Sequence, residues 1–240
     1  MRVEVCCNSL ESALNAQKAG ADRIELCSEL GVGGITPSYG LLKAVIERIS
    51  IPVRVLIRPR GGDFTYSDEE FEVMKIDVAI CNDMGFEGIV SGVLRKDFTL
   101  DVERTKQLME IGKERSFTFH RAFDWVKDPY ETLGQLDGLG VDYILTSGQR
   151  KSAVEGMHLL NELRQKARHS VIMPGGGIRI ENADLFKNGG FEIIHLTGIK
   201  FHRTMDQVPE VPMNSDAYLK EDQVAISDQE TIRAIMNRVK

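Results

Sequence analysis

Hydrophobic and polar residues alternate in residues 53–58. Val53, Val55 and Ile57 take the odd positions, and the even positions hold two arginines and a leucine. A period of two is typical of a β-strand with two unlike faces. We therefore expect the β-branched face to pack under helices and the other face, with Arg58, to point away from them. The proline that follows cannot continue a central strand, so charged side chains collect at the strand's end.

Strand-like and helix-like stretches alternate along most of the chain. The expected strands cover residues 2–6, 22–27, 53–58, 88–91, 116–120, 142–147, 170–173 and 191–197. Helices between them begin at capping signals such as Ser67-Asp-Glu-Glu70 and Asp128-Pro-Tyr-Glu131. Eight strand–helix units in succession predict an α/β protein with the fold of a single-domain (β/α)8 TIM-like barrel over residues 1–240.

A doubly wound open sheet is the second interpretation. Its strands are more often apolar on both faces, and the sequence lacks a Rossmann glycine motif. Residues 200–225 break the alternation with two prolines and many polar side chains. They predict an irregular excursion before the last helix.

Composition and charge narrow the function classes. The 240-residue chain has a formal net charge of −6, which argues against a nucleic-acid partner held through its phosphates. A strand begins directly after Met1, so we expect no signal peptide, and no apolar stretch approaches membrane-spanning length. The four cysteines show no zinc-type spacing and are expected to be reduced thiols in the cytoplasm.

The functional residues of a (β/α)8 barrel lie at the carboxyl ends of its strands, and the two-residue period indicates which of them face the lumen. We expect Cys6, Glu25, Cys27, His120 and His195 to point inward. Each also has a structural explanation. Free cysteines are more often small core residues than ligands, and His120 also fits a hydrogen-bonded structural histidine.

Other inward charges have a structural interpretation too. Glu4 and Arg54 are expected to pair near the barrel floor, in a buried ionic layer that also includes Arg23 and Glu25. Cys7 falls on the helix-facing side of its strand, and Cys81 belongs to a helix. Neither is therefore a candidate ligand.

Arginines and glycines at the strand ends predict an anion-binding mouth. Arginine binds carboxylate and phosphate groups well, and barrels often bind phosphate through backbone N–H groups in the loop after the seventh strand. The alternatives are an arginine–carboxylate network and a turn that simply requires glycine. The candidates from this argument are Arg58, Arg60, Arg121, Gly175, Gly176 and Gly177.

Six stretches of the sequence form a distinctive set of motifs. They are Glu4-Val-Cys6, Gly20-Ala-Asp-Arg-Ile-Glu-Leu-Cys27, Gly34-Ile-Thr-Pro-Ser38, Ile57-Arg-Pro-Arg-Gly-Gly-Asp-Phe64, Thr118-Phe-His-Arg-Ala-Phe-Asp124 and Leu145-Thr-Ser-Gly-Gln149. Together they resemble the CutC family, named for copper homeostasis. The resemblance implies a cytoplasmic TIM-like barrel that forms homo-oligomers, a dimer or a tetramer, with copper ligands at Cys6 and Cys27. From the last motif, Ser147 and Gly148 join the expected anion-binding set.

Two hypotheses follow. In the first, Cys6 and Cys27 lie on neighbouring strands about 5 Å apart and bind Cu(I), a soft ion that thiolates suit; the nearby Glu25 slightly weakens that selectivity. In the second, the chain is an enzyme for a small anionic or phosphorylated metabolite. The arginines would hold the anion, and His120 or Glu25 would move a proton. The expected partners are thus a copper ion or a small anion, with no organic cofactor.

Overall fold

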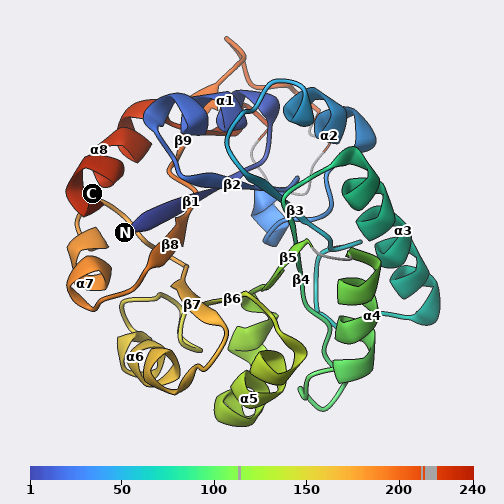
Figure 1. The fold of residues 1–240 in the computed structure, drawn as a ribbon. Coiled ribbons are helices and arrows are strands. Elements are labelled where there is room, and N and C mark those ends of the chain that lie inside the picture. The colour runs from blue at the N-terminus through green and yellow to red at the C-terminus, as the bar shows by residue number, and fades with distance from the viewer. Residues whose placement is uncertain (113–114, 212, 214–220) are drawn as a thin grey trace.

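The computed structural model describes residues 1–240 except 113–114, 212 and 214–220. Its centre is an eight-stranded sheet with the order β7-β6-β5-β4-β3-β2-β1-β8, in which paired neighbours run parallel (Figure 1). An isolated parallel bridge between Gly175 and His195 joins the two outermost strands and nearly closes the barrel. The strands are β1 (Arg2–Cys7), β2 (Arg23–Leu26), β3 (Val53–Leu56), β4 (Gly88–Ser91), β5 (Ser116–Phe119), β6 (Tyr143–Thr146), β7 (Val171–Pro174) and β8 (Ile193–Leu196). The (β/α)8 TIM-like barrel is confirmed.

Helices surround the barrel, as Figure 1 shows. Their bounds are α1 (Leu10–Ala19), α2 (Tyr39–Ile46), α3 (Asp68–Met84), α4 (Val102–Gly112), α5 (Pro129–Leu139), α6 (Met157–Lys166), α7 (Ala183–Asn188) and α8 (Gln229–Val239), with 3-10 turns η1 (Leu30–Val32) and η2 (Arg121–Trp125). The predicted capping box is present at α3, where Ser67 and Glu70 each accept a hydrogen bond from the other's backbone N–H. Asp128 caps α5 through its side chain alone, which accepts from the backbone N–H groups of Tyr130 and Glu131.

The two-residue period places the strand side chains as expected. Val53, Val55 and Ile57 belong to the large core between the sheet and the helices, and so does Cys7. A separate cluster forms on the inner side of the barrel; it consists of Cys6, Cys27, Leu56 and Val90. Adjacent residues of β1 therefore have opposite environments, because successive side chains of a strand point to opposite faces.

The buried charges form separate pairs rather than one ionic layer. Glu4 pairs with Arg23, its direct neighbour in the β1–β2 register. Arg54 does not pair with Glu4, as the sequence suggested, but donates to Glu87, with 2.8 Å between Nε and Oε2. Its side chain runs across Gly88, where an added Cβ would lie 3.1 Å from the Arg54 Cγ atom. The missing side chain at that glycine allows Arg54 to reach toward β4 and β5.

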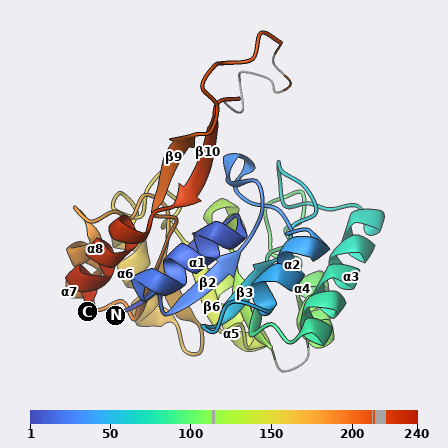
Figure 2. The same cartoon turned by 90° about the horizontal axis from the view of Figure 1, so that it is seen from above.

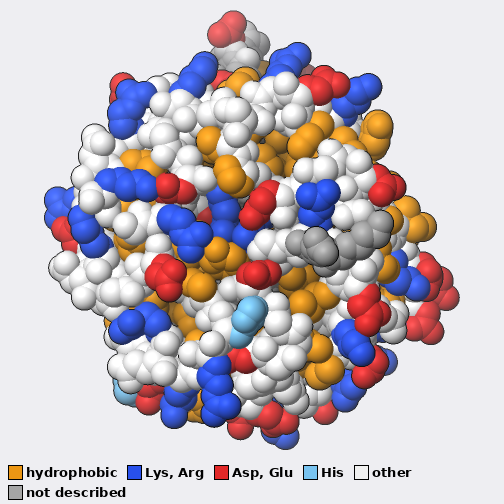
Figure 3. Space-filling model, in the orientation of Figure 1, with side chains coloured by type: hydrophobic (Ala, Val, Ile, Leu, Met, Phe, Trp, Pro, Cys, Tyr) orange, Lys and Arg blue, Asp and Glu red, His pale blue; other side chains and the backbone are white. Residues whose placement is uncertain are grey.

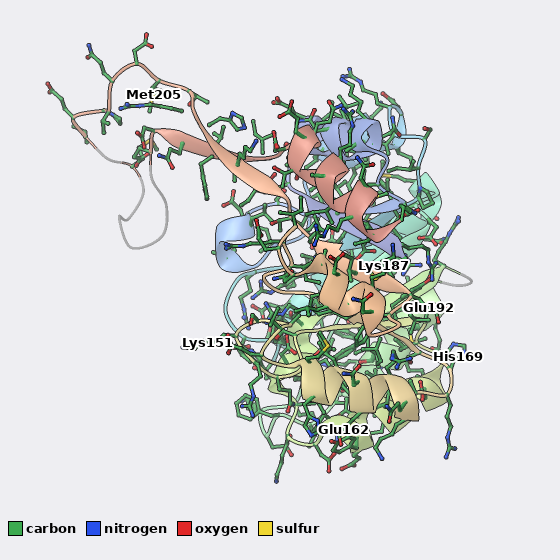
Figure 4. The ribbon with its side chains drawn as sticks, turned by 90° about the vertical axis from the view of Figure 1, so that its left-hand side faces the viewer. Lys151, Glu162, His169, Lys187, Glu192 and Met205 are labelled. Carbon is green, nitrogen blue, oxygen red and sulfur yellow. The ribbon has the colours of Figure 1, made fainter. Side chains whose placement is uncertain are left out.

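Residues 200–225 were expected to be irregular, but the two ends of this segment form strands. β9 (Ile199–Arg203) and β10 (Gln223–Ser227) pair in antiparallel fashion and form an arm that projects from the barrel (Figure 2). Met205, beyond β9, lies far from the barrel body, on the side of Lys151, which follows β6 (Figure 4). His169, which precedes β7, lies at the opposite end. The arm therefore rises beside the carboxyl ends of the barrel strands.

Residues 212 and 214–220 of the expected excursion lie outside the described part of the chain. Among the residues that are described, no helix combines the length and the apolar character needed to cross a membrane. Acidic and basic side chains are interspersed on the face opposite the arm, which Figure 3 views. The homo-oligomer, the cytoplasmic location and the absence of a nucleic-acid partner stay predictions.

Candidate metal centre at the barrel mouth

A cavity of about 670 Å³ opens at the carboxyl ends of the strands, on the side of the arm. Functional residues of (β/α)8 barrels collect at this end, so the cavity is the candidate site. The loop after β7 contributes Gly176 and Gly177, and β9 contributes Ile199 and Phe201. The polar and sulfur-bearing side chains that line it from the strand ends are Cys6, Glu25, Arg58, His120, Arg121 and His195.

The sulfur atoms of Cys6 and Cys27 lie 3.5 Å apart. Cys6 stands opposite Glu25 in the register of β1 and β2, and its thiol donates to Glu25 Oε1 at 3.3 Å. Both cysteines are buried and free. Cys7, one residue further along β1, faces the helices, and its sulfur lies 3.6 Å from the carbonyl oxygen of Val5.

His195 completes a group of possible metal ligands. One ligand atom each from Cys6, Glu25 and His195 lies within 4.8 Å of the other two, and all three residues are buried. Nδ1 of His195 is 2.8 Å from Oε1 of Glu4, which also pairs with Arg23. This carboxylate holds the ring by Nδ1, so Nε2 is the nitrogen left for a ligand. A carboxylate that orients a histidine in this way is typical of metal centres.

The protonation states follow from burial and charge. The hydrogen bond with Cys27 and burial raise the pKa of the Cys6 thiol well above its usual range. Burial also raises the pKa of Glu25. Burial alone would raise the pKa of Glu4 too, but the charge of Arg23 and the hydrogen bond with His195 outweigh it and lower that pKa to about 2. Without a cation, the Cys6 thiol is therefore protonated and Glu4 is ionised.

His120 stands on the cavity wall as a neutral donor. Its Nδ1 accepts a hydrogen bond from the backbone N–H of Ala122 at 3.2 Å, which places the ring proton on Nε2. Burial and the nearby charge of Arg58 lower its pKa to about 3. The ring of Phe64 packs against it with 4.8 Å between ring centroids. Nε2 is buried and has no hydrogen-bond partner among the described residues.

Arg58 lines the cavity, but its guanidinium is already held by the protein backbone. Nη1 donates to the carbonyl oxygens of Val32 and Gly34, both at 2.8 Å, and Nη2 donates to that of Gly62 at 2.7 Å. The sequence left open whether the Arg58 fork binds an anion or belongs to an arginine–carboxylate network. In the structure the fork joins the loops that follow β2 and β3. Its carbonyl partners carry no formal charge, so they do not balance the positive charge of the guanidinium.

Arg60 lies outside the cavity, although the sequence grouped it with Arg58. Its Nε donates to Glu70 Oε1 at 2.6 Å, and its Nη2 lies 3.3 Å from an oxygen of Asp63. It lines a second hollow beside the start of α3. β3 ends at Leu56 and Pro59 cannot continue it, so the two-residue period no longer determines where the Arg60 side chain points.

Arg121, Ser147 and Gly148 belong to a network that fixes two loops to each other. Arg121 lines the cavity, but its Nε pairs with Asp124 at 2.7 Å. Asp124 also accepts from the backbone N–H groups of Ser147 and Gln149, at 2.9 and 3.1 Å, and from the Ser147 hydroxyl. Gly148 has φ +70°, and an added Cβ would lie 2.4 Å from the backbone oxygen of Gly156, at the end of the same loop. The donor groups of Ser147 and Gly148 therefore already have hydrogen-bond partners within the protein, and they are not free to bind an anion.

The glycines after β7 have different surroundings. Gly176 and Gly177 line the cavity and have φ values of +103° and +74°, a conformation that favours glycine. Gly175 pairs with the backbone of His195, and a Cβ there would lie 2.4 Å from a side-chain carbon of Leu145. Only the second and third glycines thus remain candidates for contact with a ligand.

His195 was predicted to face the lumen but was not included among the candidate ligands. The period of β8 was the available signal, and the structure adds the Glu4 contact that gives the ring its orientation. Because Glu4 and His195 are far apart in the sequence, this contact depends on the closure of β8 against β1. The two-residue period of a single strand carries no information about this contact between strands.

The sequence matches the model of the CutC family over residues 1–200. The chain belongs to the CutC family. The family protein CutC of Serratia proteamaculans is 43% identical over 239 residues, which cover 99% of this chain and 95% of the relative. That of Photorhabdus laumondii is 50% identical over 194 residues, covering 81% of this chain and 78% of the relative.

A solved structure of a CutC protein is also similar. It is the crystal structure of the candidate copper homeostasis protein CutC from Streptococcus agalactiae, with a TM-score of 0.78 and 32% sequence identity. It covers 82% of this chain, and this chain covers 98% of it. The CutC family match includes Cys6, Glu25, Cys27 and His195 and ends within β9. The candidate metal group therefore belongs to the CutC part of the chain, and most of the arm lies beyond it.

Proposed function

We propose that the protein binds Cu(I) at the floor of the cavity through the thiolates of Cys6 and Cys27, and that it takes part in copper homeostasis. The observation that carries the proposal is the 3.5 Å between the two sulfur atoms. Metal–sulfur bonds of about 2.3 Å, as in zinc sites, allow two sulfurs on one ion to lie at most about 4.6 Å apart. The observed separation fits a bent arrangement with room for a third ligand, and Nε2 of His195 is the candidate for it.

The chemistry of the donor set supports a soft ion. Thiolate ligands favour Cu(I), and the buried position of Cys6 and Cys27 protects such an ion from water. Binding must displace the Cys6 proton, because metal ions bind the thiolate. The family name and the copper homeostasis in the name of the Streptococcus agalactiae protein also favour copper.

Zn²⁺ is the main competitor for such a site. Two cysteines and one histidine, with Glu25 close by, also suit zinc, which binds sulfur, nitrogen and oxygen ligands in a tetrahedral arrangement. The proposal therefore requires that the protein prefers Cu(I) to Zn²⁺ under reducing conditions. Metal preference has to be measured on the same protein samples that test the ligands.

The test is competition for Cu(I) against a chromogenic Cu(I) chelator under reducing conditions. We expect one-to-one binding in the wild type and loss of that binding in Cys6→Ser and in Cys27→Ser. Cys7→Ser is the matched control, because Cys7 is the next residue of β1 and faces the opposite side. Cys81→Ser is a second control, since Cys81 is buried within α3. Both controls should bind like the wild type.

Each variant is first checked for folding by circular dichroism. Undiminished Cu(I) binding in the Cys6→Ser, Cys27→Ser double variant would show that copper binds elsewhere, and the proposal would then fail. If the wild type binds Zn²⁺ more tightly than Cu(I), the site is a zinc site rather than a copper site.

A further inference from the structure

The cavity is much larger than a metal ion requires. Its volume of about 670 Å³ lies within the range of about 300–1,000 Å³ that is typical of small-molecule sites. The candidate metal ligands occupy only the floor, at the ends of β1, β2 and β8. The wall formed by His120 and Phe64 lies after β5 and β3 and has no part in the metal group.

Arg58 gives this wall an uncompensated positive charge. Arg23 and Arg54 are equally buried, and they pair with the carboxylates of Glu4 and Glu87. Arg58 is 4% exposed, yet within the described ranges its guanidinium pairs with no carboxylate and its Nε has no hydrogen-bond partner. A buried charge without a counter-charge is costly, so an anion that enters the cavity gains a favourable interaction with it.

His120 supplies a donor at the same wall. Its Nδ1 edge packs against Gly92 and Ala122, neither of which lines the cavity: a Cβ added to Gly92 would lie 2.6 Å from Nδ1. His120 itself lines the cavity, and its protonated Nε2 is buried beside it without a hydrogen-bond partner among the described residues, so a ligand reaches this donor after a small movement of the ring or its neighbours. Phe64 holds this arrangement, because it packs on the His120 ring and its own ring lies 5.0 Å from the Arg58 guanidinium carbon.

The rest of the lining suits an organic anion. The charged side chains around the cavity are Arg58, Arg121, Arg179, Glu25 and Glu181, and His195 lies at the floor. Glu25 is in the metal group, where its Oε1 accepts from the Cys6 thiol. Apolar side chains provide a surface for the uncharged part of a ligand; they include Leu30, Leu56, Phe64, Leu145 and Ile178.

We propose that this cavity binds a small organic molecule with an oxyanion group, a carboxylate or a phosphate, whose charged end accepts the hydrogen bond of His120 Nε2 within the field of Arg58. Arg58 contributes charge rather than a direct bidentate contact, because its Nη atoms already donate to backbone carbonyls. This site is distinct from the metal group, so the proposal does not depend on copper binding.

The test is isothermal titration calorimetry of the metal-free protein with two probes, inorganic phosphate and succinate. We expect saturable one-to-one binding of at least one probe, and the tighter probe identifies the oxyanion class. His120→Asn should weaken binding about tenfold or more, which corresponds to about 1.4 kcal/mol for a lost hydrogen bond to a charged group. Asparagine is a good residue at the start of a helical turn, so this variant can retain the hydrogen bond from Ala122 N–H.

Arg58→Gln should weaken binding at least as much, and Arg60→Gln is its matched control. Arg60 lies two residues further along the chain and lines a different hollow, so its replacement should leave the affinity unchanged. If Arg58→Gln fails to fold after the loss of its carbonyl contacts, the affinity of His120→Asn alone decides whether the anion binds at this wall. Binding should also persist in the Cys6→Ser, Cys27→Ser double variant, which separates this proposal from the metal site.

Three results would overturn the proposal. One is the absence of saturable binding for both probes. Another is equal affinity in the wild type and His120→Asn, which would place the anion elsewhere on the protein. The third is loss of binding in Arg60→Gln but not in His120→Asn, which would assign the anion to the hollow beside α3.

Discussion

Glu4 and His195 meet between the paired strands β1 and β8, with 2.8 Å between Oε1 and Nδ1. They are direct neighbours in the register of β1 and β8. Glu4 is fully buried and is kept ionised by Arg23, so it can hold the proton on Nδ1 and leave Nε2 as the nitrogen available to a metal ion. The pairing of β1 with β8 therefore brings together the carboxylate and the candidate metal ligand that it orients.

The first prediction concerns Glu4 as a positioning residue. Glu4→Gln keeps the shape of the side chain but removes the charge that orients His195. We expect Cu(I) affinity to fall by about 10- to 100-fold, as is typical when the partner of a metal-ligating histidine is replaced. The measurement is chelator competition, together with histidine NMR of the metal-free protein, which reports the protonated ring nitrogen of His195.

Glu87→Gln is the control for this prediction. It also removes the carboxylate partner of a buried arginine, Arg54, but at a distance from the metal group. We expect a loss of stability with unchanged Cu(I) affinity. Equal losses of affinity in Glu4→Gln and Glu87→Gln would mean that Glu4 acts only through the stability of the barrel.

The second prediction concerns the pH dependence of metal binding. The hydrogen bond with Cys27 and burial raise the pKa of Cys6, so this thiol keeps its proton throughout the neutral range. A metal ion must displace that proton, and apparent affinity should therefore rise with pH, by up to about tenfold per pH unit for each proton displaced. Competition assays between pH 6 and about pH 8 measure the slope. A flat profile would exclude Cys6 as a ligand.

The third prediction concerns the hydrogen bonds of Asp124, which join the loop after β5 to the loop after β6. Asp124 is almost buried and accepts hydrogen bonds from Arg121, from Thr146 Oγ1 and from the backbone N–H groups of Ser147 and Gln149. Asp124→Asn replaces one accepting oxygen by an NH₂ group that faces donors. We expect a loss of about 2–4 kcal/mol in the free energy of unfolding, because hydrogen bonds to charged groups contribute about 1.5–3 kcal/mol each. Urea denaturation measures it.

Asp97→Asn is the matched control for Asp124→Asn. Asp97 accepts from the backbone N–H and the hydroxyl of Thr99 in a similar local turn, but it is exposed. Its replacement should cost less than about 1 kcal/mol, because water satisfies the groups that lose their partner. Similar losses of unfolding free energy in both variants would show that the contacts of Asp124 between the two loops contribute no more than an exposed turn.

Local chemistry explains which parts of the fold could be predicted. The side chains of a strand alternate, so Val53 and Arg58 could be assigned to opposite faces without knowledge of their neighbours. The same rule separated Cys6 from Cys7. The capping box of Ser67 and Glu70 depends only on residues within one helical turn, and it is present as predicted.

Contacts between loops could not be predicted in this way. The carbonyl partners of Arg58 come from Val32, Gly34 and Gly62, and no side-chain pattern marks a free carbonyl oxygen. Arg60 lies beyond the end of β3 and follows a proline, so its direction depends on Glu70 in the next helix. The pairing of β9 with β10 joins segments separated by about twenty residues, and the prolines between them suggested irregular structure.

The last prediction uses His120 to test the electrostatics of the cavity wall. Its pKa is lowered from 6.5 to about 3 in the folded protein, first by burial and then by Arg58. The unfolded chain therefore binds a proton between these values, and the folded protein does not. Stability from the neutral ring is fully present above pH 6.5 and is lost progressively as the pH falls toward 3, by up to about 1.4 kcal/mol per pH unit.

The expected observation is a difference between two proteins, because other groups also titrate in this range. Asparagine does not titrate, so the free energy of unfolding of the wild type should fall relative to that of His120→Asn as the pH decreases from 7 to 4. Urea denaturation at each pH measures both values, and the wild-type protein should lose more. A constant difference would mean that His120 titrates alike in both states and is open to water. A ring open to water would also be unable to keep Nε2 as a buried, unpartnered donor for an anion in the cavity.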